Sequence, residues 1–284
     1  MNPNRSSNLF DPERGENPLS LDEILTHLVT ERIGRHLTIL EEVDSSNSHL
    51  AREAERLPDG AVCVAELQTA GRGRHGRAWT SPPRRNLMFS VVFKESSIPG
   101  PIATLIGALS TVQATRGVGD WIALKWPNDL VSESPDDGAV EKKVGGVLSE
   151  TKTDRAGKPF LILGIGINVN SRLEDFPEEI RERVSTLSFL SGQVWNRNWL
   201  LAEILNRIEA LWKSSEAIGA ESVIDEARRN CSTLGKQVRL RIGDQVIEGE
   251  AVDLDPMGRL LLRDETGYVY PVELGEVVQA RRIT

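Results

Sequence analysis

The sequence predicts an α/β protein that ends in a small β-barrel, and two observations lead to this fold class. Apolar, strand-like runs alternate with amphipathic helical segments over residues 41–230. After Cys231 the pattern changes to short alternating runs separated by the turn signals IGD, DPMG and DETG, which is typical of a small antiparallel barrel. We therefore divide the chain into an N-terminal extension (1–40), a mixed α+β main domain (41–230) and a barrel domain (231–284).

The first predicted elements follow a polar N-terminus. Residues 1–18 are rich in Asn, Ser, Pro, Gly and charge, which predicts a mobile extension. A short helix is expected next, with Ser20 as N-cap and Glu23 in capping-box position. HLTILEEV predicts a strand, and a helix through SSNSHLAREAERL can begin at either Asp44 or Ser45 as its cap.

The rest of the main domain alternates between strands and helices. Strands are predicted for AVCVAELQ (61–68), LMFSVVF (87–93), WIALKW (121–126), GGVLSET (145–151) and FLILGIGINVN (160–170). Helical spacing of apolar residues predicts helices over 101–116, 196–214 and about 220–230. The segment SESPDDGAVEK (132–142) has the composition of an exposed loop.

Composition and charge exclude several classes of protein. The net charge of −8 argues against broad binding to DNA or to an anionic membrane surface. Cys63 and Cys231 lie outside any CxxC spacing, so a zinc site or a disulfide framework is not expected, and two free thiols suit a reducing cytoplasm. No apolar run approaches the roughly 20 residues of a membrane helix, and the N-terminus lacks a secretory signal. These features predict a soluble, cytoplasmic protein.

A glycine- and arginine-rich loop follows the strand at 61–68. Its segment Gly71–Gly76 matches the dinucleotide pattern GxGxxG, but it leads into AWTSPP, which cannot continue a helix, so we reject that interpretation. The Walker pattern GxxxxGK[ST] is absent as well. Arg72, Arg74 and Arg77 instead offer three guanidinium forks to phosphate or carboxylate groups. A solvated basic turn is the alternative for the loop taken alone.

Three further segments have a composition that favours a binding site. KWPND places the cation Lys125 and the carboxylate Asp129 at a strand end. Lys143 precedes a glycine pair, and the strand GIGINVN carries glycines that leave room for a ligand against bare backbone. Each has a plain alternative, because Trp126 could be core and the strand glycines could mark a bulge.

Together, and in this order, the segments resemble the biotin protein ligase family. The resemblance covers about residues 41–284. It runs through DSSN (44–47), QTAGRGRHGRAW (68–79), SP (81–82), NL (86–87), KWPNDL (125–130), KVGGVL (143–148) and GIGINV (164–169). GRGRxGRxW combined with KWPND is a highly specific pair of motifs.

The resemblance implies a catalytic domain of the biotin/lipoate ligase type and a two-step reaction. Biotin and ATP form biotinyl-5′-AMP and pyrophosphate, and an acceptor lysine then displaces AMP. The implied biotin-binding residues are Ser45, Ser46, Gln68, Gly71 and Arg72. Those implied for the adenylate and nucleotide are Arg74, Arg77, Trp79, Lys143, Gly146, Gly164 and Asn168, with Trp79 stacking on adenine.

The implied catalytic residues are Lys143, Asp129, Arg74 and Lys125. Lys143 would contact both the biotin carboxylate and the α-phosphate, and Asp129 would orient the acceptor amine and assist its deprotonation. Lys125 could hold the Asp129 carboxylate or contact phosphate. Mg²⁺ is expected with ATP, bridging phosphates rather than sitting in a cage of protein ligands.

The implied partner is the biotin carboxyl carrier domain of a biotin-dependent carboxylase, and a homodimer is left open. Some family members carry an N-terminal winged-helix domain, whereas about 40 residues precede the catalytic domain here, so we expect the stand-alone enzyme. Two alternatives compete with this interpretation. A lipoate ligase shares the chemistry, but its RRxxGGG pattern is missing. A nucleic-acid-binding module conflicts with the acidic balance and the absence of stacked aromatics in the barrel segment.

Overall fold

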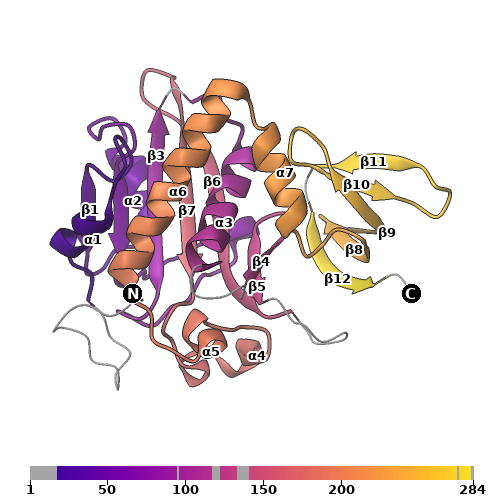
Figure 1. The fold of residues 1–284 in the computed structure, drawn as a ribbon, viewed down its shortest axis with the longest axis horizontal. Helices are drawn as coiled ribbons and strands as arrows, with labels where there is room; N and C mark the ends of the chain where they lie inside the picture. Colours follow the sequence, from indigo (N-terminus) through magenta and orange to yellow (C-terminus); the bar gives the residue numbers. More distant parts are fainter. Residues whose placement is uncertain (1–17, 95, 117–121, 133–140, 274, 283–284) are drawn as a thin grey trace.

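The computed structural model describes residues 18–94, 96–116, 122–132, 141–273 and 275–282 (Figure 1). Two expectations therefore fall largely outside the described residues: the mobile extension over 1–18 and most of the loop over 132–142. None of the helices in these described ranges is both long enough and apolar enough to cross a membrane.

A seven-stranded sheet forms the centre of the main domain, in the order β1-β2-β3-β7-β6-β5-β4 (Figure 1). β1 and β2 are parallel, and every other neighbouring pair is antiparallel. The strands are β1 (Leu37–Leu40), β2 (Val62–Ala65), β3 (Leu87–Lys94), β4 (Ile122–Lys125), β5 (Asp129–Ser132), β6 (Lys143–Thr153) and β7 (Pro159–Ile167).

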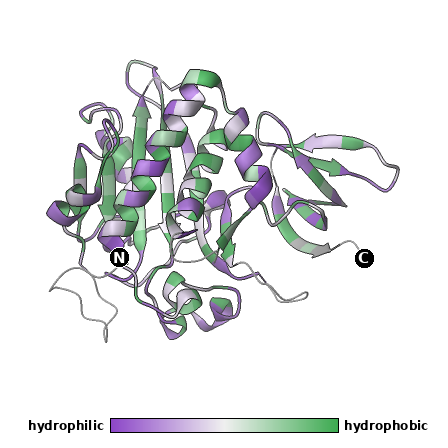
Figure 2. Cartoon of the chain, in the orientation of Figure 1, coloured by the Kyte–Doolittle hydropathy of each residue, from purple (hydrophilic) through white to green (hydrophobic). Residues whose placement is uncertain are grey.

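The two faces of the sheet are covered by different helices. Side chains alternate between the faces of a strand, so Val62 and Val64 of β2 enter the large core, whereas Cys63 enters a smaller one. The large core packs against α3 (Gly100–Arg116), α6 (Arg197–Ile218) and α7 (Glu221–Asn230); the smaller core packs against α2 (Ser46–Glu53). In Figure 2 the central strands are largely hydrophobic, while α6 shows the mixed colouring of a helix with one buried face.

Helix starts agree with their capping residues. The Ser20 side chain accepts a hydrogen bond from Glu23 N at the start of α1 (Leu21–His27), which confirms the predicted N-cap. Asn196 accepts from the backbone N–H groups of Asn198 and Trp199 at the start of α6. Ser45 is the N-cap of α2 without a side-chain capping bond. α2 ends at Glu53, earlier than predicted, and Pro58 disfavours helical backbone in the residue before it.

The structure also contains elements that the sequence did not predict. The chain turns back after β4, and β5 pairs antiparallel with it, so Lys125 and Asp129 face each other across a hairpin. Two short helices, α4 (Glu178–Arg181) and α5 (Leu187–Ser191), and two 3₁₀ turns, η1 (Arg74–Gly76) and η2 (Leu173–Asp175), were also missed. Elements of three to five residues are too short to show a helical or strand period.

The C-terminal region folds into five antiparallel strands in the order β11-β10-β9-β8-β12. These are β8 (Lys236–Ile242), β9 (Gln245–Leu254), β10 (Leu260–Arg263), β11 (Val269–Val272) and β12 (Glu276–Arg282). The antiparallel strands agree with the prediction, but the closure of a barrel is not seen. Among the described residues the sheet ends at β11 and β12, which do not pair with each other. The sheet lies beside α7, as Figure 1 shows.

Candidate active site

One cavity of about 520 Å³ gathers the residues singled out from the sequence. Its walls come from the start of α2, the arginine-rich loop, β5, β6, β7 and the start of β12. Every candidate site residue lines this cavity except Gly71: Ser45, Ser46, Gln68, Arg72, Arg74, Arg77, Trp79, Lys125, Asp129, Lys143, Gly146, Gly164 and Asn168. Segments that are far apart in the sequence thus meet around one space.

Lys143 and Asp129 form an ion pair at the centre of the cavity. The Lys143 Nζ lies 2.6 Å from Asp129 Oδ1 and 5.7 Å from the centroid of the Trp79 ring. A Cβ at Gly146 would sit 3.4–3.6 Å from these two side chains, so a larger residue there would crowd the pair. Lys125 instead lies beside Glu141, with Nζ 3.7 Å from Oε2, so the cation that holds Asp129 is Lys143.

The arginine-rich loop is closed on itself by backbone hydrogen bonds. Gly73 N donates to Arg77 O at 2.7 Å, and Trp79 N donates to Gly71 O at 2.9 Å. A Cβ on Gly71 would lie 2.6 Å from Trp79 O, which explains a glycine at this position. Gly71 therefore shapes the loop through its backbone and does not line the cavity.

Each arginine of the loop has a defined partner. Arg72 donates to Ser48 Oγ at 2.8 Å, and Arg74 donates to Asn128 Oδ1 at 3.1 Å. Arg77 donates two hydrogen bonds to Glu276 of β12, one of them at 2.6 Å, and this pairing raises the pKa of Arg77 and lowers that of Glu276. These partners all lie outside the loop, and they hold the guanidinium groups at the cavity rim.

Burial makes Arg74 different from its two neighbours. Burial lowers the pKa of the Arg74 guanidinium, while the nearby carboxylates of Asp129 and Glu276 raise it. Arg74 also donates to the carbonyl oxygen of Gly275 at 3.3 Å. A half-buried cation beside two carboxylates interacts strongly with an anion, because little water screens it.

A chain of polar groups lines the end of the cavity next to α2. Gln68 Oε1 accepts from the backbone N and the hydroxyl of Ser46 at 2.7 and 3.1 Å. Ser90 Oγ lies 2.7 Å from Ser46 Oγ and 2.5 Å from Asn47 Oδ1. Asn47 Nδ2 donates to Glu150 Oε2 at 2.8 Å. Burial raises the pKa of Glu150, but the hydrogen bonds from Asn47 and Lys152 outweigh it and leave the pKa lowered.

The space over Gly164 is filled by protein, which corrects the expectation of a ligand against bare backbone. A Cβ on Gly164 would lie 2.1 Å from Asn47 Oδ1, and one on Gly166 would lie 2.7 Å from Trp79 Cε2. Alternate residues of β7 face the α2 side of the sheet, so both glycines make room there for these two side chains.

Two polar atoms at the opposite end of the cavity are buried without a hydrogen-bond partner in the described part of the chain. They are Trp79 Nε1 and Asn168 Oδ1. Asn168 Nδ2 donates to Ser185 O at 3.2 Å, which fixes the side chain with its oxygen as an available acceptor. Buried polar atoms without partners are costly, so they point to a ligand or to water.

The structure adds residues to the site that the sequence did not single out: Asn47, Ser90, Asn128, Glu141, Glu150 and Glu276. Asn47 and Asn128 lay inside motifs that were quoted, and Ser90 was the one polar residue in LMFSVVF, a signal that could have found it. Glu276 carried no such signal, because its partner Arg77 is 199 residues away.

Comparison with known proteins defines the class to which this fold and site belong. A family model described as "Biotin/lipoate A/B protein ligase family" matches residues 40–170. A second, described as "Biotin protein ligase C terminal domain", matches residues 233–279. The main domain is thus of the biotin/lipoate ligase class, and the C-terminal sheet matches a domain of the biotin-specific branch.

Individual relatives give the family. The biotin–[acetyl-CoA-carboxylase] ligase of Mycobacterium tuberculosis is 30% identical over 96% of this chain and 100% of its own length. The bifunctional ligase/repressor BirA of Bacillus subtilis is 32% identical over 90% of this chain and 79% of its own length. The Aquifex aeolicus biotin protein ligase, solved in complex with biotin and ATP, is 33% identical with a TM-score of 0.73, covering 88% of this chain and 100% of that one. The chain belongs to the biotin protein ligase family.

Proposed function

We propose that the protein joins biotin and ATP into biotinyl-5′-AMP and transfers the biotinyl group to a lysine of a biotin carboxyl carrier domain. The observation that carries this proposal is the order of groups along one cavity. A neutral polar cluster lies at one end, cations lie in the middle, and an aromatic ring with a free amide oxygen lies at the other end. That order suits a cyclic urea, an acyl phosphate and an adenine in turn.

The polar cluster fits the ureido ring of biotin. A cyclic urea needs donors for its carbonyl oxygen and acceptors for its two N–H groups, and neighbouring hydroxyl and amide side chains supply both. Ser46 and Gln68 are already hydrogen-bonded to each other, so the cluster is organised before a ligand binds. Ser45 lines the same part of the cavity, and Arg72 lies at its edge.

The central cations fit the activation step. A biotin carboxylate oxygen attacks the α-phosphorus of ATP, the new P–O bond forms, and the bond to pyrophosphate breaks. Negative charge rises on the phosphoryl oxygens during this step, and fixed cations that stabilise it in a site with little water lower the barrier. Lys143 is the central candidate for this role, with Arg74 beside it and Lys125 and Arg77 towards the departing phosphates.

The far end of the cavity fits the nucleotide. Trp79 offers a ring face for adenine, and Asn168 Oδ1 can accept a hydrogen bond from the adenine amino group. The carboxylates Asp129, Glu141 and Glu276 are each ion-paired with a cation in the described structure, so they suit Mg²⁺ carried on ATP phosphates better than a protein cage. Such an ion would neutralise phosphate charge.

The Lys143–Asp129 pair fits the transfer step. The neutral acceptor amine attacks the acyl carbon of the adenylate, the bond to AMP breaks, and one amine proton must leave. A free lysine has a pKa of about 10.4 and is therefore mostly protonated at neutral pH. Asp129 can orient the amine and accept that proton.

Incubation with ATP, Mg²⁺, a carrier domain and either biotin or lipoate tests the function. We expect the intact mass of the carrier domain to increase by one biotinyl group with biotin, and to stay unchanged with lipoate. Lipoyl attachment in place of biotinyl attachment would support the lipoate ligase alternative, and no attachment of either acid would refute acyl transfer.

A further inference from the structure

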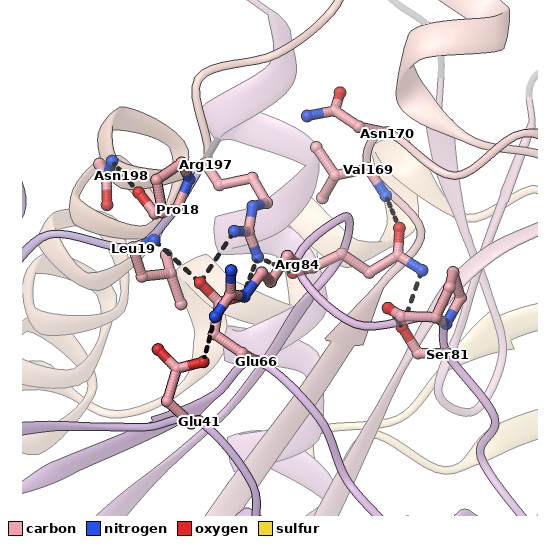
Figure 3. A network of polar contacts seen from close by, with 12 residues as sticks. Pro18, Leu19, Glu41, Glu66, Ser81, Arg84, Val169, Asn170, Arg197 and Asn198 are labelled. Atoms are coloured by element: carbon pink, nitrogen blue, oxygen red, sulfur yellow. Dashed lines mark hydrogen bonds and ion pairs between the residues drawn. The ribbon is translucent and has the colours of Figure 1, made fainter. Parts of the chain in front are cut away.

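A buried ion pair lies behind the cavity and outside its lining. Arg197, the first residue of α6, is fully buried, and Glu66 is 3% exposed. The guanidinium forms two parallel hydrogen bonds to the carboxylate, Nη1 to Oε2 at 2.7 Å and Nη2 to Oε1 at 3.0 Å (Figure 3). Burying two charges costs stability that an apolar pair would not cost, so this pair calls for a role beyond packing.

The pair joins the two stems of the arginine-rich loop. Glu66 stands two residues before Gln68, where the chain enters the loop, and Asn86 stands where the chain leaves it for β3. Arg197 Nη1 also donates to Asn86 O at 2.8 Å, so one guanidinium binds both stems. Arg84 N donates to Glu66 O at 3.3 Å and makes a second link between them.

The outgoing stem in turn fixes the end of β7. Val169 N donates to Asn86 Oδ1 at 2.8 Å, and Asn86 Nδ2 donates to Ser81 Oγ at 2.9 Å (Figure 3). Val169 directly follows Asn168, whose free amide oxygen faces the nucleotide end of the cavity. Three segments that carry cavity residues therefore converge on the Glu66–Arg197 pair: the incoming stem, the outgoing stem and the end of β7.

We propose that Arg197 and Glu66 act as a positioning pair for the loop that covers the nucleotide and the adenylate. By holding both stems at fixed separation, the pair sets where residues 71–79 stand relative to Asn168. The inference deepens the proposed function and rests on it. Neither residue lines the cavity, so the pair acts through the loop and takes no direct part in the chemistry.

Replacement of the pair by apolar residues separates positioning from stability. Glu66→Leu/Arg197→Met removes both charges, and such replacements of buried ion pairs are often neutral or stabilising. The hydrogen bond to Asn86 O is lost all the same. We expect a cooperatively folded variant whose KM for ATP rises about tenfold or more, because small displacements of positioning groups have effects of that order. Preformed biotinyl-AMP should dissociate faster by a similar factor.

Two further variants make the test specific. Arg197→Lys keeps the charge but lacks the planar fork, so it cannot bind Glu66 and Asn86 O as the arginine does, and we expect part of the loss. Glu209→Gln is the matched control. It lies on the same helix, is 4% exposed, and accepts from the backbone N–H groups of residues 31–33, away from the loop. It should lower the melting temperature and leave adenylate dissociation within about twofold of wild type.

The outcomes distinguish this inference from the proposed function. If the unmodified protein makes no biotinyl-AMP from biotin and ATP, the proposed function fails and the inference fails with it. If the unmodified protein is active but the double variant and Arg197→Lys both hold ATP and adenylate as it does, the pair is only structural. The pair is also only structural if Glu209→Gln releases adenylate as fast as these two variants do. Should the double variant not fold, Arg197→Lys against Glu209→Gln decides alone.

Discussion

Lys143 is held at the centre of the cavity by a single carboxylate. Its Nζ lies 2.6 Å from Asp129 Oδ1, and both side chains are about one-third exposed. An exposed or half-exposed ion pair adds little to stability, so this lysine can be exchanged without unfolding the protein. The same pair gives each residue a distinct chemical task, since the cation faces phosphate and the carboxylate faces the acceptor amine.

Lys143→Ala should lower the rate of adenylate formation by about 10²–10³-fold, because a fixed charge that stabilises the transition state is worth that much. Biotin-dependent release of pyrophosphate is the measurement. Lys152→Ala is the control, since it removes a lysine from the same strand that does not line the cavity. Pyrophosphate release at the wild-type rate in Lys143→Ala would refute the role.

Asp129→Asn should slow transfer more than activation, because its proposed partner is the acceptor amine. We expect about a hundredfold loss in single-turnover transfer from preformed biotinyl-AMP, in the range for a lost general base. Activation should change less, although Lys143 loses its ion-pair partner. Equal losses in the two half-reactions would instead assign Asp129 to holding Lys143.

At the scale of elements, the arginine-rich loop and α6 show how side chains determine where a segment lies. The loop is anchored by arginines whose partners sit on other segments, and α6 is anchored near its middle by Glu209. An anchored loop can still open, because each anchor is worth only a few kcal/mol. A helix anchored by buried hydrogen bonds has less freedom.

Arg74→Gly should still activate biotin but hold the adenylate loosely. Losing one charge-assisted hydrogen bond costs about 1.5–3 kcal/mol, which shifts the closed loop about ten- to a hundredfold towards the open state. A mixed anhydride that escapes reacts with any neutral amine. Biotin should therefore appear on an unrelated lysine-rich protein mixed with the variant, biotin and ATP, and be detected by blotting. Labelling at the wild-type background while adenylate is still made would contradict the gate.

Glu209 makes the stability of the α6 region depend on pH. Burial raises its pKa, but hydrogen bonds from the backbone N–H groups of Glu31, Ile33 and Arg32 lower it further, to about 2 from 4.5. Its contribution is then present above pH 4.5 and is lost as the pH falls through about 2, and it amounts to about 3 kcal/mol. Chemical unfolding of Glu209→Gln and wild type should differ most at pH 7 and converge near pH 2. A difference that is independent of pH would show that the carboxylate charge is not what matters.

At the scale of the whole molecule, the C-terminal sheet takes part in the catalytic site. Glu276, Val277 and Val278 at the start of β12 line the cavity, and Glu276 binds Arg77 across 199 residues of sequence. The order of the loop in the ligand-free protein therefore depends on a region that folds outside the main sheet. The two regions form one functional unit.

Glu276→Gln should loosen the loop, because Arg77 loses the charge on its partner. We expect trypsin to cut after the loop arginines several-fold faster in the ligand-free variant, since cleavage follows the population of the open form. Glu273→Gln is the control, because its partner Arg259 lies in the C-terminal sheet itself. Equal cleavage rates in the two variants would mean that the sheet does not order the loop.

The sequence by itself determined the elements and the chemistry of this protein. Apolar periodicity determined most of the helices and long strands, because it depends on neighbours a few residues apart. The motifs determined which residues could meet biotin and ATP, since residue type decides whether a group can donate, accept or carry charge. Ser20 as a helix cap is the simplest case, and its hydrogen bond is present.

Only the tertiary structure decided which of these groups touch. The β4–β5 hairpin put Asp129 next to Lys143 and left Lys125 with Glu141, a choice that the motif KWPND left open. Asn47 filled the space over Gly164, and Arg197 reached Glu66 across 131 residues. These contacts depend on how distant segments pack. Local sequence carries no signal of packing between distant segments, because the partners are set by the geometry of the whole sheet and its helices.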